Sequence, residues 1–349
     1  MAAEMPAGDE TTQAQWEQEA ARTLKLPHDP FAHVAKRRKL DPAVKGKDDN
    51  VLTFLRSRPQ IASMREVAAT TPAAKRTSKR NLNGDEAADL LYSDRFKGHA
   101  AARQQDETVN AFLKRLPVAD PATANAGPWL WVSSSQIPRA QKQHAKREDV
   151  DAFIEQGESL LEAFIKRRST VEAENHGKAP ATITRYMRPH RDKLENDLLS
   201  AAVSTGTTCG KWMLFPSSED LPRFWRVVAE ATAEGKLGPV SKVGTYDPLD
   251  KKDATLICVY TYDFTDNDDV RRVLDQLVEL GLCRRDGKPI YYKCDAYTYL
   301  GIASENTYKL RASLFSSGEV LKNEAKVLED GQILRGQRKS TATDSFFAL

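Results

Sequence analysis

The chain has 349 residues, and 52 Lys and Arg against 49 Asp and Glu give it a formal net charge of +3. This balance is too even for a histone-like or tail-driven nucleic-acid binder. Hydrophobic residues make up only 40% of the chain and the mean hydropathy is −0.57. Such a polar average predicts a folded domain that carries long polar tails.

Several classes of protein are excluded by what the chain lacks. It has no apolar run of about 18 residues, so we expect no membrane-spanning helix. Its N-terminal residues are partly acidic and include no apolar segment, which argues against a secretory signal. None of the four cysteines forms a C-x-x-C pair, so zinc-ribbon and thioredoxin motifs are absent. We therefore expect an intracellular protein of the cytoplasm, the nucleus or both, with reduced thiols.

Residues 1–104 are rich in Ala, Thr, Pro and charged residues. This composition buries too little apolar surface to offset the entropy of ordering, so we expect a mostly disordered tail. The basic cluster from Lys36 to Lys39 is either a nuclear import signal or a solvated charge run.

The expected domain covers residues 105–318 and starts with an apolar helical pattern over 109–116. A strand follows at 129–132, and amphipathic helices are predicted over 149–166 and 182–199, within a helical insertion at about 140–205. The second of these helices has a basic side, which is either a phosphate-facing surface or a solvated face. That side consists of Arg185, Arg188, Arg191 and Lys193.

Beyond residue 210 the pattern alternates between strands and helices. Strands are predicted at 211–215, 242–246, 255–264 and 289–302. Helices are predicted from 219 or 220 to near 235, and from a Thr265 cap to Gly281. The acidic run 263–269 is more typical of helix capping than of a calcium loop. Residues 319–349 are expected to form a polar tail.

Alternation along the 289–302 strand separates two faces. One face would carry Tyr291, Lys293, Asp295, Tyr297 and Tyr299, and the other would carry Tyr292, Cys294, Ala296, Thr298 and Leu300. The second set suits a core. The first could stack bases and meet phosphate, or it could be an exposed face with cross-strand tyrosines and a Lys–Asp pair. Tyr260 and Tyr262 could extend it.

Cations recur in the strand-like segments. Lys211, Lys242 and Lys293 lie in expected strands, and Arg311 follows them. If they converge on one sheet face, they form an anion site. The chain has no histidine after His190, no glycine-rich phosphate loop and no paired carboxylates of the general acid–base type. We therefore expect no catalytic residues, no metal ligands and no cofactor.

The segments that carry a family resemblance are Gly210-Lys211-Trp212-Met213-Leu214-Phe215, Leu256-Ile257-Cys258-Val259-Tyr260-Thr261 and the run from Tyr291 to Ile302. They resemble the family typified by the basophilic leukaemia-expressed protein, a domain of unknown function. That family is similar in fold to the cap-binding translation initiation factor 4E. The resemblance implies an α+β domain, with a curved antiparallel sheet and helices on its convex face.

The resemblance to the initiation factor also points to a partner surface. The strand 211–215 and the following residues 219–225 resemble the factor's strand and helix with a Phe-Trp pair. It implies that Trp225 contacts a peptide partner, and a core tryptophan is the alternative. After Trp225 the chain has no tryptophan, so one half of the factor's tryptophan sandwich around the cap is absent.

The C-terminal run Thr343-Asp344-Ser345-Phe346-Phe347 resembles the end of a sliding-clamp interaction peptide. The resemblance implies that Phe346 and Phe347 would fill a pocket of the clamp. The positions that are usually glutamine and aliphatic are Ser340 and Thr343 here.

Together these features predict a non-enzymatic domain that binds a nucleotide or an RNA end. The lysines and Arg311 would meet phosphate, Tyr291, Tyr297 and Tyr299 would stack on bases, and Asp295 would lie beside them. One alternative is a protein-interaction adapter that uses the Trp225 surface and the tails. Another is an enzyme that acts on a phosphorylated ligand. No membrane partner is expected.

Overall fold

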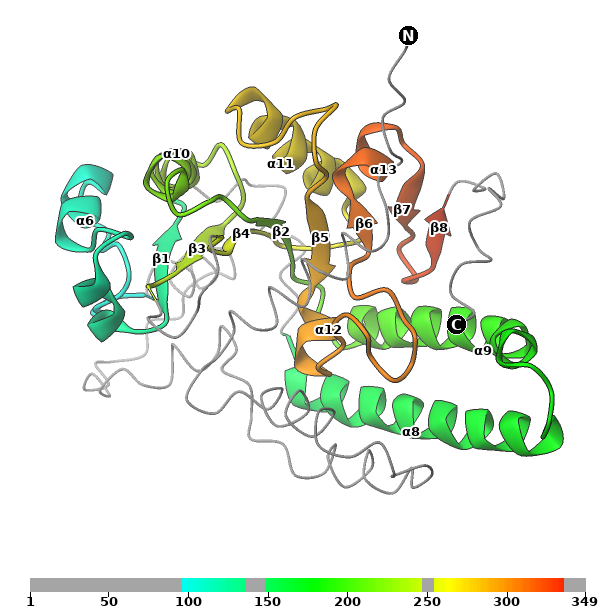
Figure 1. Ribbon diagram of the computed structural model, residues 1–349. Coiled ribbons are helices and arrows are strands. Elements are labelled where there is room, and N and C mark those ends of the chain that lie inside the picture. Colours follow the sequence, from blue (N-terminus) through cyan, green and yellow to red (C-terminus); the bar gives the residue numbers. More distant parts are fainter. Residues whose placement is uncertain (1–95, 136–147, 247–253, 336–349) are drawn as a thin grey trace, which may run out of the picture.

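A six-stranded antiparallel sheet forms the centre of the computed structural model, which describes residues 96–135, 148–246 and 254–335 (Figure 1). The strands lie in the order β1-β3-β4-β2-β5-β6. They are β1 (Trp129–Ser133), β2 (Gly210–Leu214), β3 (Val240–Gly244), β4 (Ile257–Thr261), β5 (Tyr291–Cys294) and β6 (Phe315–Ser316). The α+β class and the antiparallel sheet are confirmed. The basic cluster at 36–39 lies outside the described residues.

Helices cover the face of the sheet that holds the main core. They are α6 (Val109–Arg115), α10 (Leu221–Ala233) and α11 (Asn267–Glu279), and the short 3-10 helix η1 (Pro121–Ala126) leads into β1. Trp212 on β2 is fully buried, and its indole N–H donates to the Val270 carbonyl at the start of α11, 3.1 Å away. Asp266 caps α11 by accepting from the Asp269 amide, so the cap lies one residue beyond the expected Thr265.

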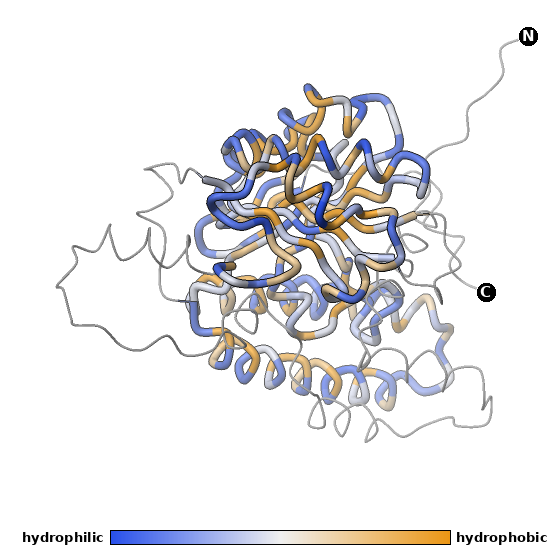
Figure 2. Tube along the Cα trace, turned by 90° about the vertical axis from the view of Figure 1, so that its left-hand side faces the viewer, coloured by the Kyte–Doolittle hydropathy of each residue, from blue (hydrophilic) through white to orange (hydrophobic). Residues whose placement is uncertain are grey.

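Two long helices, α8 (Val150–Glu174) and α9 (Pro180–Ser204), follow β1 and precede β2 in the chain, and they form a helical hairpin beside the sheet (Figure 1). They lie within the expected insertion. Asp149 caps α8 by accepting from the Ala152 amide. Gly157 allows close packing against the rest of the fold, since a Cβ there would lie 2.6 Å from Leu300 Cδ1. Both helices alternate hydrophobic and hydrophilic residues, whereas the sheet layer has a hydrophobic interior (Figure 2).

The expected strand over 289–302 is wrong beyond Cys294. The chain leaves β5 and forms the short helix α12 (Asp295–Tyr299). Alternating Tyr, Thr and Ala favoured a strand, but tertiary contacts override this propensity. The Asp295 amide donates to the Cys209 carbonyl, and the Ile302 amide donates to the Tyr297 carbonyl, both at 2.8 Å. The faces expected from alternation therefore hold only up to Cys294.

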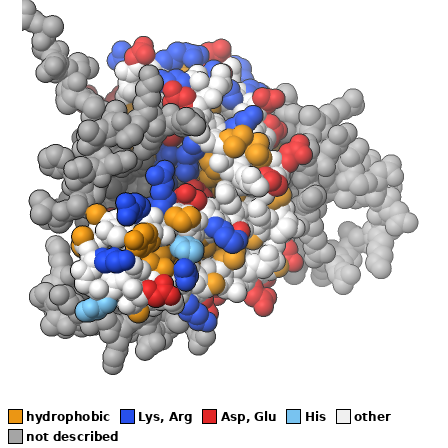
Figure 3. All heavy atoms as spheres, turned by 90° about the vertical axis from the view of Figure 1, so that its right-hand side faces the viewer, with side chains coloured by type: hydrophobic (Ala, Val, Ile, Leu, Met, Phe, Trp, Pro, Cys, Tyr) orange, Lys and Arg blue, Asp and Glu red, His pale blue; other side chains and the backbone are white. Residues whose placement is uncertain are grey.

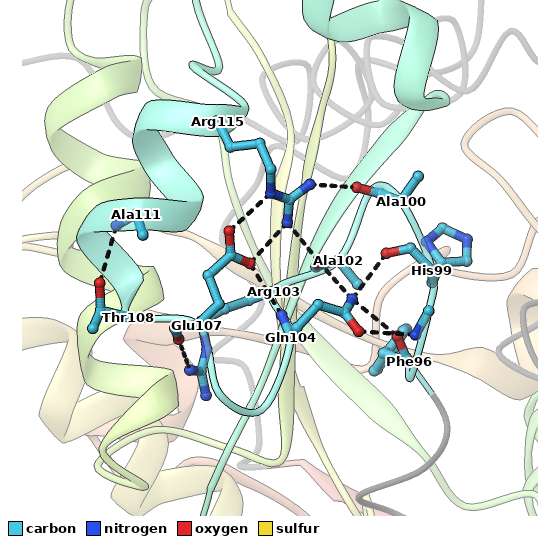
Figure 4. A network of polar contacts seen from close by, with 11 residues as sticks. Phe96, His99, Ala100, Ala102, Arg103, Gln104, Glu107, Thr108, Ala111 and Arg115 are labelled. Carbon is cyan, nitrogen blue, oxygen red and sulfur yellow. Dashed lines mark hydrogen bonds and ion pairs between the residues drawn. The ribbon is translucent and has the colours of Figure 1, made fainter.

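The folded region extends beyond both expected boundaries. Residues 96–103 pack beside β1, where the Gln104 side chain closes a turn by accepting from the Gly98 amide and donating to the carbonyls of Phe96, His99 and Ala102 (Figure 4). Arg115 joins this turn to α6 through the Ala100 carbonyl and Glu107.

After β6 the chain forms α13 (Ser317–Leu321) and a hairpin of β7 (Ala325–Val327) and β8 (Ile333–Arg335). These elements lie where a polar tail was expected. Val327 is fully buried, and Arg335 pairs with Glu195 on α9 at 2.9 Å. We call β7 and β8 the C-terminal hairpin.

Candidate ligand-binding site on the sheet

One row of directly paired residues crosses the sheet on the face opposite to α10 and α11. Trp131 pairs with Lys242, Lys242 with Cys258, Cys258 with Met213, and Met213 with Tyr291. Directly paired residues of antiparallel strands point to the same side. The next row on this side holds Tyr260, Lys211 and Lys293, since Lys211 pairs with both of the others. The register therefore brings the three predicted lysines to one face, which we call the lysine face.

The Lys242 ammonium lies on an aromatic surface. Its Nζ atom is 4.1 Å from the ring centre of Trp129, 5.0 Å from that of Trp131 and 5.8 Å from that of Tyr260. These distances are typical of cation–π contacts. Among the described residues, no hydrogen bond or ion pair is made by this ammonium. Burial and the nearby positive charge of Lys211 lower the pKa of Lys242.

Lys211 has a different environment, because it forms a buried ion pair with Asp295 at the start of α12. Its ammonium also donates to the Thr298 hydroxyl at 3.3 Å. Burial alone would lower the pKa of Lys211, but the charge of Asp295 and the hydrogen bond to it raise the pKa above its ordinary value. Lys211 is thus a charged lysine of the lysine face whose charge is balanced by Asp295.

The Tyr260 ring lies close to both of these lysines. Lys211 Nζ lies 5.4 Å from its centre and Lys242 Nζ lies 5.8 Å from it. Burial raises the pKa of Tyr260 well above its ordinary value and also raises that of the Cys258 thiol between them. Both groups are therefore neutral at physiological pH. The positive charge of the lysine face is not cancelled by either.

The structure also places the other predicted phosphate and stacking residues. Lys293 lies on the lysine face and donates to the Ile302 carbonyl at 2.7 Å. Tyr291 lies on the same face and is 8% exposed. Arg311 does not join them, because its guanidinium forms two hydrogen bonds with Glu319 in α13, at 2.9 and 3.1 Å.

Tyr297 and Tyr299 belong to α12 and not to a strand face. Both are buried in the main hydrophobic core, where Tyr297 is fully buried. Their predicted role as stacking residues depended on strand alternation through residue 299, and that alternation ends at Cys294. Burial raises the pKa of Tyr297 well above its ordinary value.

Trp225 is fully buried under α6, with its ring centre 6.5 Å from that of Phe112. Trp225 is therefore a core tryptophan, which was the alternative to a partner contact. It does not contribute to the surface of the fold. Phe346 and Phe347 lie outside the described residues.

Three aromatic residues of this site were not assigned to it from the sequence. Trp129 and Trp131 occupy alternate positions of β1, which could have identified a shared face, but their partner strand β3 is about 110 residues away. Phe96 lies 5.4 Å from Trp131, ring centre to ring centre, and comes from the segment expected to be a tail. No local pattern identifies that contact.

The described part of the chain contains no group of three or more His, Cys, Asp or Glu side chains placed to hold a metal ion. In the same residues, no helix is long and apolar enough to span a bilayer. A cation-rich aromatic surface can hold an anion beside a flat ring.

Comparison with known families shows which family the chain belongs to. The family model described as Basophilic leukemia-expressed protein Bles03 matches residues 47–301. The chain belongs to this family. The matched range includes β1 to β5, all three lysines of the lysine face and the helical hairpin. It ends just after α12, so β6, α13 and the C-terminal hairpin follow it.

Proposed function

We propose that the chain is a non-enzymatic binding protein that holds a nucleotide or an RNA end on its lysine face. The observation that carries this proposal is the Lys242 ammonium, which lies on three aromatic rings without an anionic partner among the described residues. Lys242 is half-buried, and charges that lose hydration inside a protein are usually paired. A ligand phosphate would supply the missing anion.

The charge balance of the face supports a phosphate. It holds the ammoniums of Lys211, Lys242 and Lys293, and Asp295 forms an ion pair with Lys211. Lys293 donates a hydrogen bond to the Ile302 carbonyl. Anion binding at Lys242 would reverse the effect of burial and raise the pKa of that lysine.

The aromatic residues support a flat ring beside that phosphate. Trp129 is only partly buried and forms the outer wall next to Lys242. Stacking of a base on such a ring is tolerant of base identity. This arrangement takes the place of the predicted Tyr297 and Tyr299, and it retains Tyr291 at the edge of the face. The expected likeness to initiation factor 4E fits a ligand of this class, although fold alone does not determine function.

An enzyme that acts on a phosphorylated ligand is the second candidate. A desolvated lysine with a lowered pKa is typical of nucleophilic amines. Trp225, the residue proposed for the adapter surface, is buried, and most of the two expected tails lies outside the described residues. An intracellular location, in cytoplasm or nucleus, fits a chain in which all four cysteines are free.

The test is calorimetric titration of the full chain with nucleoside mono-, di- and triphosphates, a cap analogue and a 5′-phosphorylated RNA pentamer. Lys242→Met retains length and apolar contact but removes the charge. Lys326→Met, at an exposed position of β7, is the matched control. We expect a phosphorylated ligand to bind to the wild type and the control, and to bind Lys242→Met at least about tenfold more weakly.

Three results would overturn this proposal. Equal affinity of Lys242→Met and wild type would show that the ligand lies elsewhere. Absence of binding by every ligand would leave the lysine face without a nucleotide role. Turnover of a bound ligand, followed by mass spectrometry, would support the enzyme and exclude a purely binding function.

A further inference from the structure

The far end of the helical hairpin has a concentration of positive charge that the proposed site does not use. Residues 166–193 contain eight Lys and Arg and three Asp and Glu, a net charge of +5, whereas the whole chain carries +3. We call these residues the arginine tip. Figure 3 shows this end of the molecule, where Lys and Arg side chains surround hydrophobic ones on the lower part of the visible face.

Three arginines of α9 repel one another. Arg185, Arg188 and Arg191 follow at intervals of three residues, which places them on one side of the helix. Like charges at this spacing destabilise a helix. Among the described residues, no carboxylate pairs with any of the three, and they are exposed or half-buried.

Other helical cations of the fold, two of them within the arginine tip, are paired with carboxylates. Arg168 pairs with Glu172 at 2.8 Å, Lys193 with Asp197 at 2.7 Å and Arg271 with Asp275 at 2.7 Å, all at a spacing of four residues. The chain thus forms such pairs readily. The three uncompensated arginines of α9 depart from that pattern and favour an external anion.

A cleft opens beside Arg185, the first of these arginines, and has an aromatic wall. It is lined by Arg167, Val171 and Glu174 from α8 and by Arg185, Tyr186 and His190 from α9, among others. Tyr186 is 38% exposed, one of three large hydrophobic residues so exposed in the described chain. Lys178 Nζ and the Arg185 guanidinium lie 5.3 and 5.6 Å from its ring centre. Arg167 Nε donates to His190 Nε2 at 3.2 Å, which holds both side chains at the cleft.

We propose that the arginine tip binds single-stranded nucleic acid, with phosphates on Arg185, Arg188 and Arg191 and a base stacked on Tyr186. Guanidinium groups match phosphate geometry, and an exposed tyrosine between cations is a surface for a base. The acidic side chains of a peptide, Asp and Glu, have no flat ring to stack on Tyr186. A membrane would require several apolar anchors, and Tyr186 is the only exposed large hydrophobic residue in the arginine tip.

This site stands apart from the lysine face, and its test avoids phosphorylated ends. The probe is a fluorescein-labelled 20-nucleotide oligouridine with hydroxyl ends, titrated with the full chain at several salt concentrations. We expect binding that weakens with salt, with a log–log slope of about −0.7 for each phosphate contacted. The triple variant Arg185→Gln, Arg188→Gln, Arg191→Gln should reduce the size of that slope by about 2.

The control is a second triple variant, which removes the same amount of charge from exposed arginines outside the arginine tip. It carries Arg223→Gln, Arg226→Gln and Arg285→Gln. It should leave the slope unchanged. Tyr186→Ala should weaken binding by about tenfold, whereas Tyr186→Phe should bind like the wild type, because the phenyl ring still stacks. Circular dichroism verifies that each variant retains its helices.

Two other ligands are titrated in the same way: a 20-residue polyglutamate and anionic phosphatidylglycerol vesicles. Equal binding of polyglutamate and oligouridine, without an effect of Tyr186→Ala, would overturn the proposal in favour of an acidic peptide. Vesicle binding without oligouridine binding would overturn it in favour of a membrane. Lys242→Met should retain oligouridine binding, so failure at the lysine face and failure at the arginine tip are separate results.

Discussion

The Nζ atom of Lys242 lies 4.1 Å from the ring centre of Trp129, a residue that precedes it by more than one hundred positions. The β1–β3 register creates this contact, because Trp131 pairs directly with Lys242 and Trp129 pairs with Gly244. The ammonium gains a cation–π contact but loses hydration. Lys242 therefore contributes charge to the lysine face at a cost in stability.

Replacement of Lys242 by Met should change how the free energy of unfolding depends on pH. The pKa of Lys242 is lowered in the folded chain, so the unfolded chain binds the extra proton between that lowered value and the ordinary value of 10.5. The wild type should gain stability relative to Lys242→Met as pH rises through this window. Urea unfolding at pH 7 to 10.5 measures the difference, and Lys326→Met should show no such trend.

Loss of Asp295 should destabilise the fold strongly. Asp295→Asn leaves the Lys211 ammonium buried without its anion, which typically costs about 3–5 kcal/mol of the free energy of unfolding. Addition of Lys211→Met to that variant should cost little more or restore stability. A double-mutant cycle by urea unfolding measures the coupling, and a value near zero would contradict the ion pair.

Glu319 should contribute to stability above acid pH. Burial alone would raise its pKa, but the Arg311 guanidinium and the Ser316 groups lower the pKa of Glu319 to about 2. The depressed pKa gives stability that is present above the ordinary value of 4.5 and is lost as pH falls towards 2. Glu319→Gln should lack this loss, and should be less stable at pH 7 by up to about 3 kcal/mol. Acid titration followed by circular dichroism tests both.

The four free cysteines should differ in reactivity. Cys209 is only partly buried, whereas Cys258, Cys283 and Cys294 are buried. Burial raises the pKa of all three buried thiols, that of Cys294 to about 12. Only the thiolate attacks a maleimide at speed, so Cys209 should be labelled first at pH 7. Peptide mass spectrometry over a time course measures the order, and early labelling of Cys294 would contradict its burial.

Gly331 should be needed for the C-terminal hairpin to dock. Its φ is +87°, and a Cβ there would lie 2.6 Å from the Ser200 amide nitrogen of α9. Gly331→Ala should therefore destabilise the fold by more than about 1 kcal/mol. Gly177→Ala is the matched control, because Gly177 has a φ of +83° and nothing within 4 Å of a Cβ. Thermal unfolding of both variants separates packing from backbone strain.

The sequence predicted most strands and helices of the sheet layer. Alternation and helical periodicity are local signals, so the segments around β2, β4, α10 and α11 were identified, although their ends shifted by a few residues. The change of direction after Cys294 was missed. Its cause is non-local, because Asp295 pairs with Lys211, which lies 84 residues earlier.

The sequence predicted the kinds of side chain found in the candidate site, but only some of the residues that it named lie there. The sequence identified Lys211, Lys242 and Lys293 as strand cations, while their convergence depends on the register of β2, β3, β4 and β5. Arg311 had the right charge but a nearby acceptor in Glu319. The C-terminal hairpin was missed because its polar residues find partners on distant helices.

That C-terminal hairpin links two helices that lie more than 60 residues apart in the chain. The Asn267 side chain at the start of α11 accepts from the Val327 amide and donates to its carbonyl. On the other side, the C-terminal hairpin contacts Glu195 and Ser200 of α9. Arg335 pairs with Glu195, and the Ser200 hydroxyl donates to the Asp330 carbonyl. The helical hairpin is thereby fastened to the sheet layer. Amide hydrogens of α9 near Glu195 and Ser200 should therefore exchange with solvent at the same rates as those of α11, because the two helices would unfold as one cooperative unit.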